Sequence, residues 1–205
     1  MPSPTPSSKP KKTGNWLQPW KVLKSQEVFT GLPWLAVNVE QVRLPNGKVV
    51  DDYYQVKMKD YALIFAETAD QRVIVERQYK HGIRKVSLTL PAGSIEKDED
   101  PLTAAQRELV EETGYASDHW QSLGTFVIHG NYGCCTGHLF RAQDARKVVE
   151  PESGDLEQME IITMTRTEIA DALRKGEIAT MGTAALVAMA TNPLFSQETG
   201  SQGRS

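Results

Sequence analysis

Residues 93–115 read GSIEKDEDPLTAAQRELVEETGY, and this stretch decides much of the fold around it. Asp100 belongs to the residue types that cap helix N-termini, and Pro101 suits the first helical position. Gly114 suits the left-handed residue that commonly ends a helix. We therefore predict a helix over residues 101–113. Its apolar stripe, which should face a sheet, consists of Leu102, Ala105 and Leu109.

Three glutamates crowd the second half of this helix. Glu108 and Glu112 lie one turn apart on one face, and Glu111 lies close to both. Like charges at this spacing destabilise an isolated helix. A solvated acidic face is one interpretation of such a cluster. The other is a metal site, because Mg²⁺ in proteins is typically held by one or two carboxylates together with water and substrate phosphates.

The wider spacing favours the metal site. From Gly93 to Tyr115 the chain reads G-x5-E-x7-R-E-L-x-E-E-x-G-Y, which matches the Nudix box at all nine specified positions. The chain therefore resembles the Nudix hydrolases, which use divalent metal to cleave nucleoside diphosphates linked to another moiety. The ligands that this resemblance implies for Mg²⁺, or for Mn²⁺ in its place, are the Ala92 carbonyl and the side chains of Glu108, Glu111 and Glu112.

Physical chemistry agrees with that role. A pyrophosphate brings negative charge to a site that is already negative, so a metal must bridge the two. Bound metal orients water, polarises phosphoryl oxygens and stabilises the leaving group. The resemblance gives other box residues a structural role: Arg107 pairs with Glu99 across the loop–helix junction, Gly93 allows a tight turn after a strand, and Gly114 ends the helix.

Segments outside the box resemble the ADP-ribose pyrophosphatase branch of the family. They are GLPWLAVNVEQVRLPNGKVVDDYYQVK (31–57), RQYKHGIRKVSLTLPAGSIE (77–96) and LRKGEIATMGTAALVAMA (173–190). In that branch, N-terminal aromatic residues stack on adenine, often across a dimer with exchanged strands. The resemblance therefore implies a homodimer in which strands within residues 20–58 contribute to the interface and to base binding. The substrate-binding residues that it implies are Trp34, Tyr53 and, for the phosphates, Lys80.

The general base has several candidates. Relatives carry a glutamate in an acidic loop before a late strand, and here that loop is EPESGDLEQ, residues 150–158. Counting back from the strand favours Glu157, with Glu152 and Asp155 as competitors. Glu111 of the box is the alternative, because it need not bind metal directly.

The remaining pattern predicts an α+β fold, a Nudix-type α/β/α sandwich with a mixed sheet and a metal-binding loop–helix–loop. Helices are also expected over residues 166–176 and 183–192. The predicted strands are residues 34–44, 49–58, 61–67, 72–79, 85–93, 123–130, 137–143 and 159–165.

Length and composition predict one domain between two tails. The chain has 205 residues, 40% of them hydrophobic, and a net charge of −3, which gives no reason to expect nucleic acid as a partner. No apolar run approaches the length of a membrane span. The only cysteines are adjacent, at positions 134 and 135, which is typical of a reducing compartment and predicts a cytoplasmic protein. We expect a disordered tail over residues 1–14, a single domain over 15–195 and a flexible tail over 196–205.

The expected activity is Mg²⁺-dependent cleavage of ADP-ribose, or a related ADP-sugar, to AMP and a sugar phosphate. Two departures from the branch concern the substrate: VIHGNYGCCTGHLF (127–140) lacks the proline that many ADP-ribose hydrolases carry there, and ATMGT (179–183) replaces an aspartate. Hydrolysis of NADH, dinucleotides or other nucleoside diphosphate sugars is the alternative. A sensor that binds ADP-ribose without cleaving it is a further one.

Overall fold

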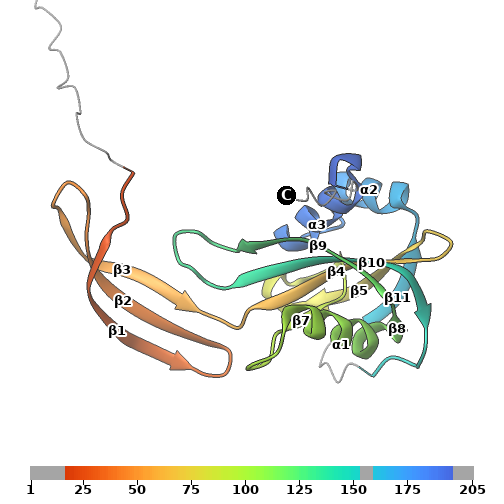
Figure 1. The fold of residues 1–205 in the computed structure, drawn as a ribbon, viewed down its shortest axis with the longest axis horizontal. Helices are drawn as coiled ribbons and strands as arrows, with labels where there is room; N and C mark the ends of the chain where they lie inside the picture. The colour runs from red at the N-terminus through yellow and green to blue at the C-terminus, as the bar shows by residue number, and fades with distance from the viewer. Residues whose placement is uncertain (1–16, 153–158, 196–205) are drawn as a thin grey trace, which may run out of the picture.

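The computed structural model describes residues 17–152 and 159–195, which form a small N-terminal sheet beside a larger layered body (Figure 1). The small sheet has three antiparallel strands in the order β1-β2-β3. Their bounds are β1 Lys21–Gly31, β2 Leu35–Arg43 and β3 Val49–Lys57.

The larger sheet is mixed. Its central path runs β11-β5-β4-β10-β8, with β6 paired to β5, β7 to β4 and β9 to β10. Strands β4 and β10 are parallel, and the other pairs are antiparallel. The bounds are β4 Tyr61–Thr68, β5 Val73–Lys80, β6 Lys85–Thr89, β7 Ala92–Ser94, β8 Tyr115–Ala116, β9 His119–Val127, β10 Thr136–Lys147 and β11 Met159–Met164.

Helices cover both faces of this sheet, as predicted (Figure 1). The side chains of β4 alternate: Ile64 packs into a cluster with α1 on one face, whereas Phe65 packs with α2 and α3 on the other. Both side chains are fully buried, so β4 is the centre of the α/β/α sandwich. The helical segments are α1 Pro101–Thr113, α2 Arg166–Arg174, α3 Met181–Thr191 and the short 3₁₀ turns η1 His81–Ile83 and η2 Pro193–Phe195.

The two central strands β4 and β5 separate along their length. They pair at Glu67 and Val73, close to the turn that joins them. Farther along, the next segment of chain lies between them, because β6 pairs with β5 and β7 then pairs with β4. The chain changes partner at Leu90 and Pro91, directly before the box. The start of the box is therefore held inside the sheet.

The N-terminal sheet is joined to the body through the end of β3. The Val56 amide donates to the Tyr132 carbonyl and the Met58 amide to the Cys134 carbonyl, both at 2.9 Å. The acceptors lie in the connection between β9 and β10. This hydrogen bonding fixes one corner of the small sheet to the larger one.

The predicted elements are present with ends that differ by a few residues, except that the strand predicted over residues 85–93 is two strands, β6 and β7, with different partners. Strand β9 begins at His119 rather than 123, and α3 begins at Met181 rather than 183. Strand β1 was not predicted. Its side chains are mostly exposed, so KVLKSQEVFTG carries none of the alternation that burial imposes on a strand. Within the described ranges, no helix has both the length and the apolar character needed to cross a membrane.

Candidate active site

Helix α1 begins and ends as its sequence predicts. The Asp100 side chain accepts hydrogen bonds from the amides of Leu102 and Thr103 at 3.0 and 3.2 Å. Gly114 ends the helix in the left-handed region with φ of 75°. A β-carbon there would lie 2.2 Å from the Val149 carbonyl oxygen, so both the backbone conformation and the packing require glycine.

Arg107 is the centre of an ion-pair network. Its guanidinium donates two hydrogen bonds to Glu99, at 2.9 and 3.0 Å, which is the predicted pairing across the loop–helix junction. It also donates to Glu108 at 2.6 Å, to Glu111 at 3.0 Å and to the Ser94 carbonyl at 3.1 Å. Hydrogen bonding by Arg107 is the main reason that the pKa of Glu99 is lowered to about 2. The network holds the loop and the acidic helix in one arrangement.

Gly93 is needed for the close approach of the helix to the loop. A β-carbon at this position would lie 1.9 Å from the carboxyl carbon of Glu108. Any other residue at position 93 would therefore displace the Glu108 side chain or shift β7, the strand that contains Gly93. This steric reason differs from the tight-turn role that the sequence suggested.

Glu112 points inward, into the body of the protein. Its carboxylate accepts a hydrogen bond from the Ala92 amide at 2.7 Å, and the residue is only 8% exposed. Burial, followed by repulsion from Glu76, raises the pKa of Glu112 to about 10. Without a cation nearby, this carboxyl group is therefore protonated at neutral pH.

Glu76, on β5, is a site residue that the sequence did not reveal. It is 1% exposed, and its Oε2 accepts hydrogen bonds from Gln78 at 2.9 Å and Thr89 at 3.2 Å. It acts on Glu112 both by charge and by a hydrogen bond. The signal was an acidic residue inside the otherwise buried run VIVE, residues 73–76, and buried carboxylates are rare unless they are paired or bind metal.

The donor set fits a hard divalent cation. Glu108, Glu112 and the Ala92 backbone lie on facing parts of α1 and β7, and all would supply oxygen. Within residues 17–152 and 159–195, no three His, Cys, Asp or Glu side chains converge closely enough to hold a metal ion as they stand. Glu108 turns toward Arg107 in this conformation.

Two of the base candidates, Glu111 and Glu152, lie beside each other near the end of α1. Glu111 has a side chain that is 46% exposed, in keeping with a residue that reaches water. Its carbonyl accepts a hydrogen bond from the Glu152 amide at 2.9 Å, so the acidic loop starts beside the helix. Glu157 and Asp155 lie outside the described residues, and their role stays a prediction.

The structure does not bring Trp34 and Tyr53 together. Trp34, in the turn between β1 and β2, is 79% exposed and its indole is open to a planar ligand. Tyr53 lies farther along the sheet, opposite Glu40. Its hydroxyl donates to the Asn131 carbonyl at 2.8 Å, and its ring packs edge-on against Trp20 at 5.4 Å. Of the two aromatic candidates, Trp34 has the more accessible face.

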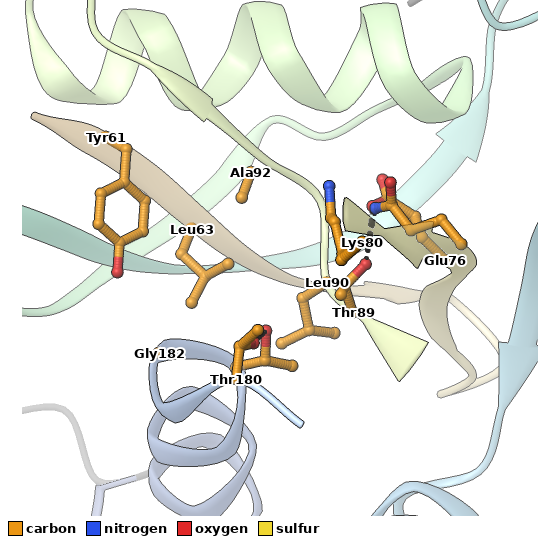
Figure 2. Close-up of a pocket in the computed structure, with 11 residues that line it drawn as sticks. Tyr61, Leu63, Glu76, Lys80, Thr89, Leu90, Ala92, Thr180 and Gly182 are labelled. Carbon is orange, nitrogen blue, oxygen red and sulfur yellow. Dashed lines mark hydrogen bonds between the residues drawn. The ribbon is translucent and has the colours of Figure 1, made fainter. Parts of the chain in front are cut away.

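Lys80 lies at the end of β5, where it lines a cavity of about 190 Å³ together with Glu76 and Ala92 (Figure 2). Figure 2 shows Lys80 and Glu76 on one side of this cavity and the N-terminal residues of α3 on another. The cavity thus begins beside Ala92, the residue that hydrogen-bonds to Glu112. The phosphate-binding role of Lys80 stays a prediction.

Comparisons with known proteins agree with this geometry. A family model described as the NUDIX domain matches residues 58–180, and one described as the nucleoside diphosphate sugar hydrolase N-terminal domain matches residues 20–56. A solved structure titled as that of an ADP compounds hydrolase superposes with a TM-score of 0.73 and covers 85% of this chain and 94% of its own, at 19% identity. That likeness confirms the fold.

Two curated relatives of similar sequence identity to this chain are named for different hydrolase activities. The chain is 29% identical over 154 residues to the ADP-ribose pyrophosphatase of Bacillus subtilis, covering 75% of this chain and 81% of the relative. It is 30% identical over 161 residues to the CMP-5'-(N-acetyl-N-hydroxy-3-aminopropyl)phosphonate hydrolase of Streptomyces rubellomurinus, covering 78% and 77%. With the NUDIX model spanning more than half of its length, this chain belongs to the Nudix hydrolase family and is related to the ADP-ribose pyrophosphatases.

Proposed function

We propose that this protein is a Mg²⁺-dependent pyrophosphohydrolase that cleaves the diphosphate of ADP-ribose or a related ADP-sugar to AMP and a sugar phosphate. The observation that carries the proposal is the convergence of Glu108 and Glu112 on the backbone at Ala92 and Gly93, beside a cavity that Lys80 lines. Oxygen donors for a metal ion and a positively charged lysine side chain thus lie beside one cavity, as binding of a metal-bridged diphosphate requires.

Each group in the site has a definite task in this reaction. Glu108, Glu111, Glu112 and the Ala92 carbonyl would hold the cation, with Mn²⁺ able to replace Mg²⁺. When bound, the metal supplies Lewis-acid stabilisation of the phosphoryl oxygens and a water of lowered pKa. Arg107 keeps the box carboxylates in place, and Lys80 offsets phosphate charge. The water is oriented by Glu157, or by Glu111 or another carboxylate of residues 150–158.

Base recognition and assembly extend the same proposal. The exposed Trp34 indole offers a face on which adenine can stack, and such stacks contribute about 1–3 kcal/mol per base. The sheet that carries Trp34 also exposes Val22, Val28 and Phe29 of β1. We propose that a second copy of the chain covers this sheet in a homodimer. The two adjacent cysteines, at positions 134 and 135, favour the reducing cytoplasm as its location.

A related candidate is hydrolysis of a different nucleoside diphosphate derivative. The CMP-linked substrate in the name of the Streptomyces relative favours it, because the identity to that relative is similar to the identity to the ADP-ribose pyrophosphatase.

A substrate panel tests the proposal and separates the two candidates. Purified protein is incubated with ADP-ribose, ADP-glucose, CDP-linked and UDP-linked sugars, NADH and diadenosine diphosphate, with Mg²⁺ or Mn²⁺, and products are separated by chromatography. We expect AMP and ribose 5-phosphate from ADP-ribose with the highest kcat/KM. A higher value for a pyrimidine nucleotide would favour the second candidate. Binding of ADP-ribose with no turnover of any compound would identify a sensor instead.

A further inference from the structure

The cavity beside the box lies where β4 and β5 separate, and residues of both strands line it (Figure 2). Strand β4 contributes Tyr61 and Leu63 to its wall, and β5 contributes Lys80. The opposite wall is the start of α3, with Thr180 and Gly182. The lining thus includes both Ala92, at the start of the box, and residues at the start of α3.

The lining combines hydroxyl and amide groups with an apolar floor. Thr180 donates a hydrogen bond to the Thr183 hydroxyl at 3.0 Å, which places two hydroxyls together on the α3 side. Across from them, Gln78 donates to the Thr89 hydroxyl at 2.8 Å. The apolar part of the lining consists of aliphatic side chains, chiefly Leu63 and Leu90. A sugar ring matches such a lining, because its hydroxyls project from the edge while its carbon atoms form apolar faces.

The volume of the cavity suits a small group. Pockets for drug-sized ligands measure roughly 300–1,000 Å³. This cavity, at about 190 Å³, is smaller than that and is on the scale of a single pentose or hexose.

The cavity begins where the reaction is proposed to occur. Ala92 lines it and donates its amide hydrogen to Glu112 at 2.7 Å. A sugar in the cavity would thus have its phosphate near the acidic cluster, and Lys80 lines the same cavity as Ala92.

We infer that this cavity is the binding site for the sugar half of the substrate. The inference rests on the proposed diphosphate hydrolysis. It adds the residues that contact the sugar half of the substrate. Thr180 binds the sugar hydroxyls. Gly182 sets the width, because a β-carbon there would lie 2.9 Å from the Tyr61 hydroxyl oxygen and 3.7 Å from Leu63.

The test compares two substrates that share everything except the sugar. One is ADP-ribose, and the other is ADP with a methyl ester on its terminal phosphate, which keeps the scissile bond and fills none of the cavity. For Gly182→Ala we expect kcat/KM to fall about 10-fold on ADP-ribose, the scale for one misplaced methyl group in a fitted pocket. For Thr180→Val we expect a fall of about fivefold, the loss of one hydrogen bond. Both variants should change less than twofold on the methyl ester.

Two controls separate occupancy of the cavity from damage to the fold. Thr191→Val makes the same substitution at the far end of α3, where the hydroxyl donates to the Val187 carbonyl, and it should leave both substrates unaffected. In the double variant Tyr61→Phe, Gly182→Ala the close contact with the hydroxyl is gone, but the added methyl group still fills the cavity. The double variant should therefore remain selectively impaired on ADP-ribose when compared with Tyr61→Phe alone.

The outcomes are distinct. Wild-type protein that hydrolyses neither substrate would overturn the proposed function, and this inference with it. Wild-type turnover of both substrates, with equal losses on the two in Gly182→Ala and Thr180→Val, would overturn the sugar site and leave the hydrolase intact. Full recovery in the double variant would show that the contact with Tyr61, and not the cavity, caused the loss.

Discussion

Glu112 and Ala92 are joined by a hydrogen bond of 2.7 Å, from the Ala92 amide to the Glu112 carboxylate, which ties the last turn of α1 to the start of β7. The contact places the buried carboxyl of Glu112 beside the backbone carbonyl that is proposed as a metal ligand. It also accounts for part of the unusual acid–base behaviour of the site, because a donor here favours the charged form while burial and Glu76 oppose it.

The first prediction concerns proton release when Mg²⁺ binds. The pKa of Glu112 is raised from 4.5 to about 10, so at neutral pH a proton must leave before the carboxylate can bind metal. Mg²⁺ affinity should rise between pH 6 and 9, and calorimetry in buffers of different ionisation enthalpy should detect released protons. Glu112→Gln should abolish that release. Affinity that does not change over this pH range would contradict the assignment.

The same raised pKa has a consequence for stability. A raised folded-state pKa stabilises the fold at low pH, and this contribution is lost as pH rises from 4.5 through about 10. In chelator at pH 8, Glu112→Gln should therefore be more stable than wild type, by about 0.5–2 kcal/mol. Urea unfolding at pH 5 and pH 8 checks this, because the advantage should shrink at pH 5.

A second prediction concerns the metal ligands. Glu108→Gln should lower kcat by orders of magnitude while circular dichroism stays unchanged, because the variant loses a charged ligand from a site that depends on charge neutralisation. Glu160→Gln, which changes an exposed carboxylate on β11, is the matched control and should be near normal. Near-normal turnover of both Glu108→Gln and Glu112→Gln at saturating Mg²⁺ would refute the ligand assignment.

Arg107 provides a third prediction. Arg107→Lys cannot reproduce the two parallel hydrogen bonds to Glu99 together with those to Glu108 and Glu111. We expect a loss of about 1–3 kcal/mol in the free energy of unfolding, the usual scale for hydrogen bonds to charged groups. The pKa of Glu99 is lowered to about 2, so wild type should lose this stabilisation as the pH falls from 4.5 toward 2. In Arg107→Lys that acid dependence should be weaker.

The fourth prediction separates the general base from the metal ligands. If Glu157 orients the attacking water, Glu157→Gln should lower kcat much more than it weakens Mg²⁺ binding. Glu152→Gln, in the same acidic loop, should then retain activity. An unchanged kcat in Glu157→Gln, with a collapse in Glu111→Gln, would move the base into the box.

The fifth prediction concerns adenine. Trp34→Ala should weaken ADP-ribose binding by about 1–3 kcal/mol, the range for a base–aromatic stack. Trp34→Phe keeps an aromatic face and should recover most of the loss. The kcat should change less than KM, because the base is remote from the reacting diphosphate. A monomeric wild type by light scattering, with an unchanged KM in Trp34→Ala, would refute both the stack and the dimer.

Local signals made helix α1 predictable in detail. Its cap at Asp100, its end at Gly114 and the pairing of Arg107 with Glu99 all depend on residues within a few turns of one another. The sandwich was predictable for a related reason, because β4 is buried on both faces and burial leaves a pattern in the sequence.

Features that depend on distant contacts were not predictable in this way. Glu76 of β5 acts on Glu112 of α1 although the two residues are far apart in the sequence, and their spacing along the chain does not predict that interaction. The cavity follows from the separation of β4 and β5, which pair at Glu67 and Val73 and then part. Tertiary geometry, not local propensity, creates both.

The end of α1 also has a mechanical consequence. The Gly114 carbonyl accepts hydrogen bonds from the amides of Val148 and Val149, and the Glu111 carbonyl accepts from the Glu152 amide. Backbone hydrogen bonds thus join the end of α1 to residues 148–152, the segment that follows β10. Amides in such a unit open cooperatively, so those of Val148 and Glu152 should exchange with deuterium at the pace of the helix rather than at that of an exposed loop.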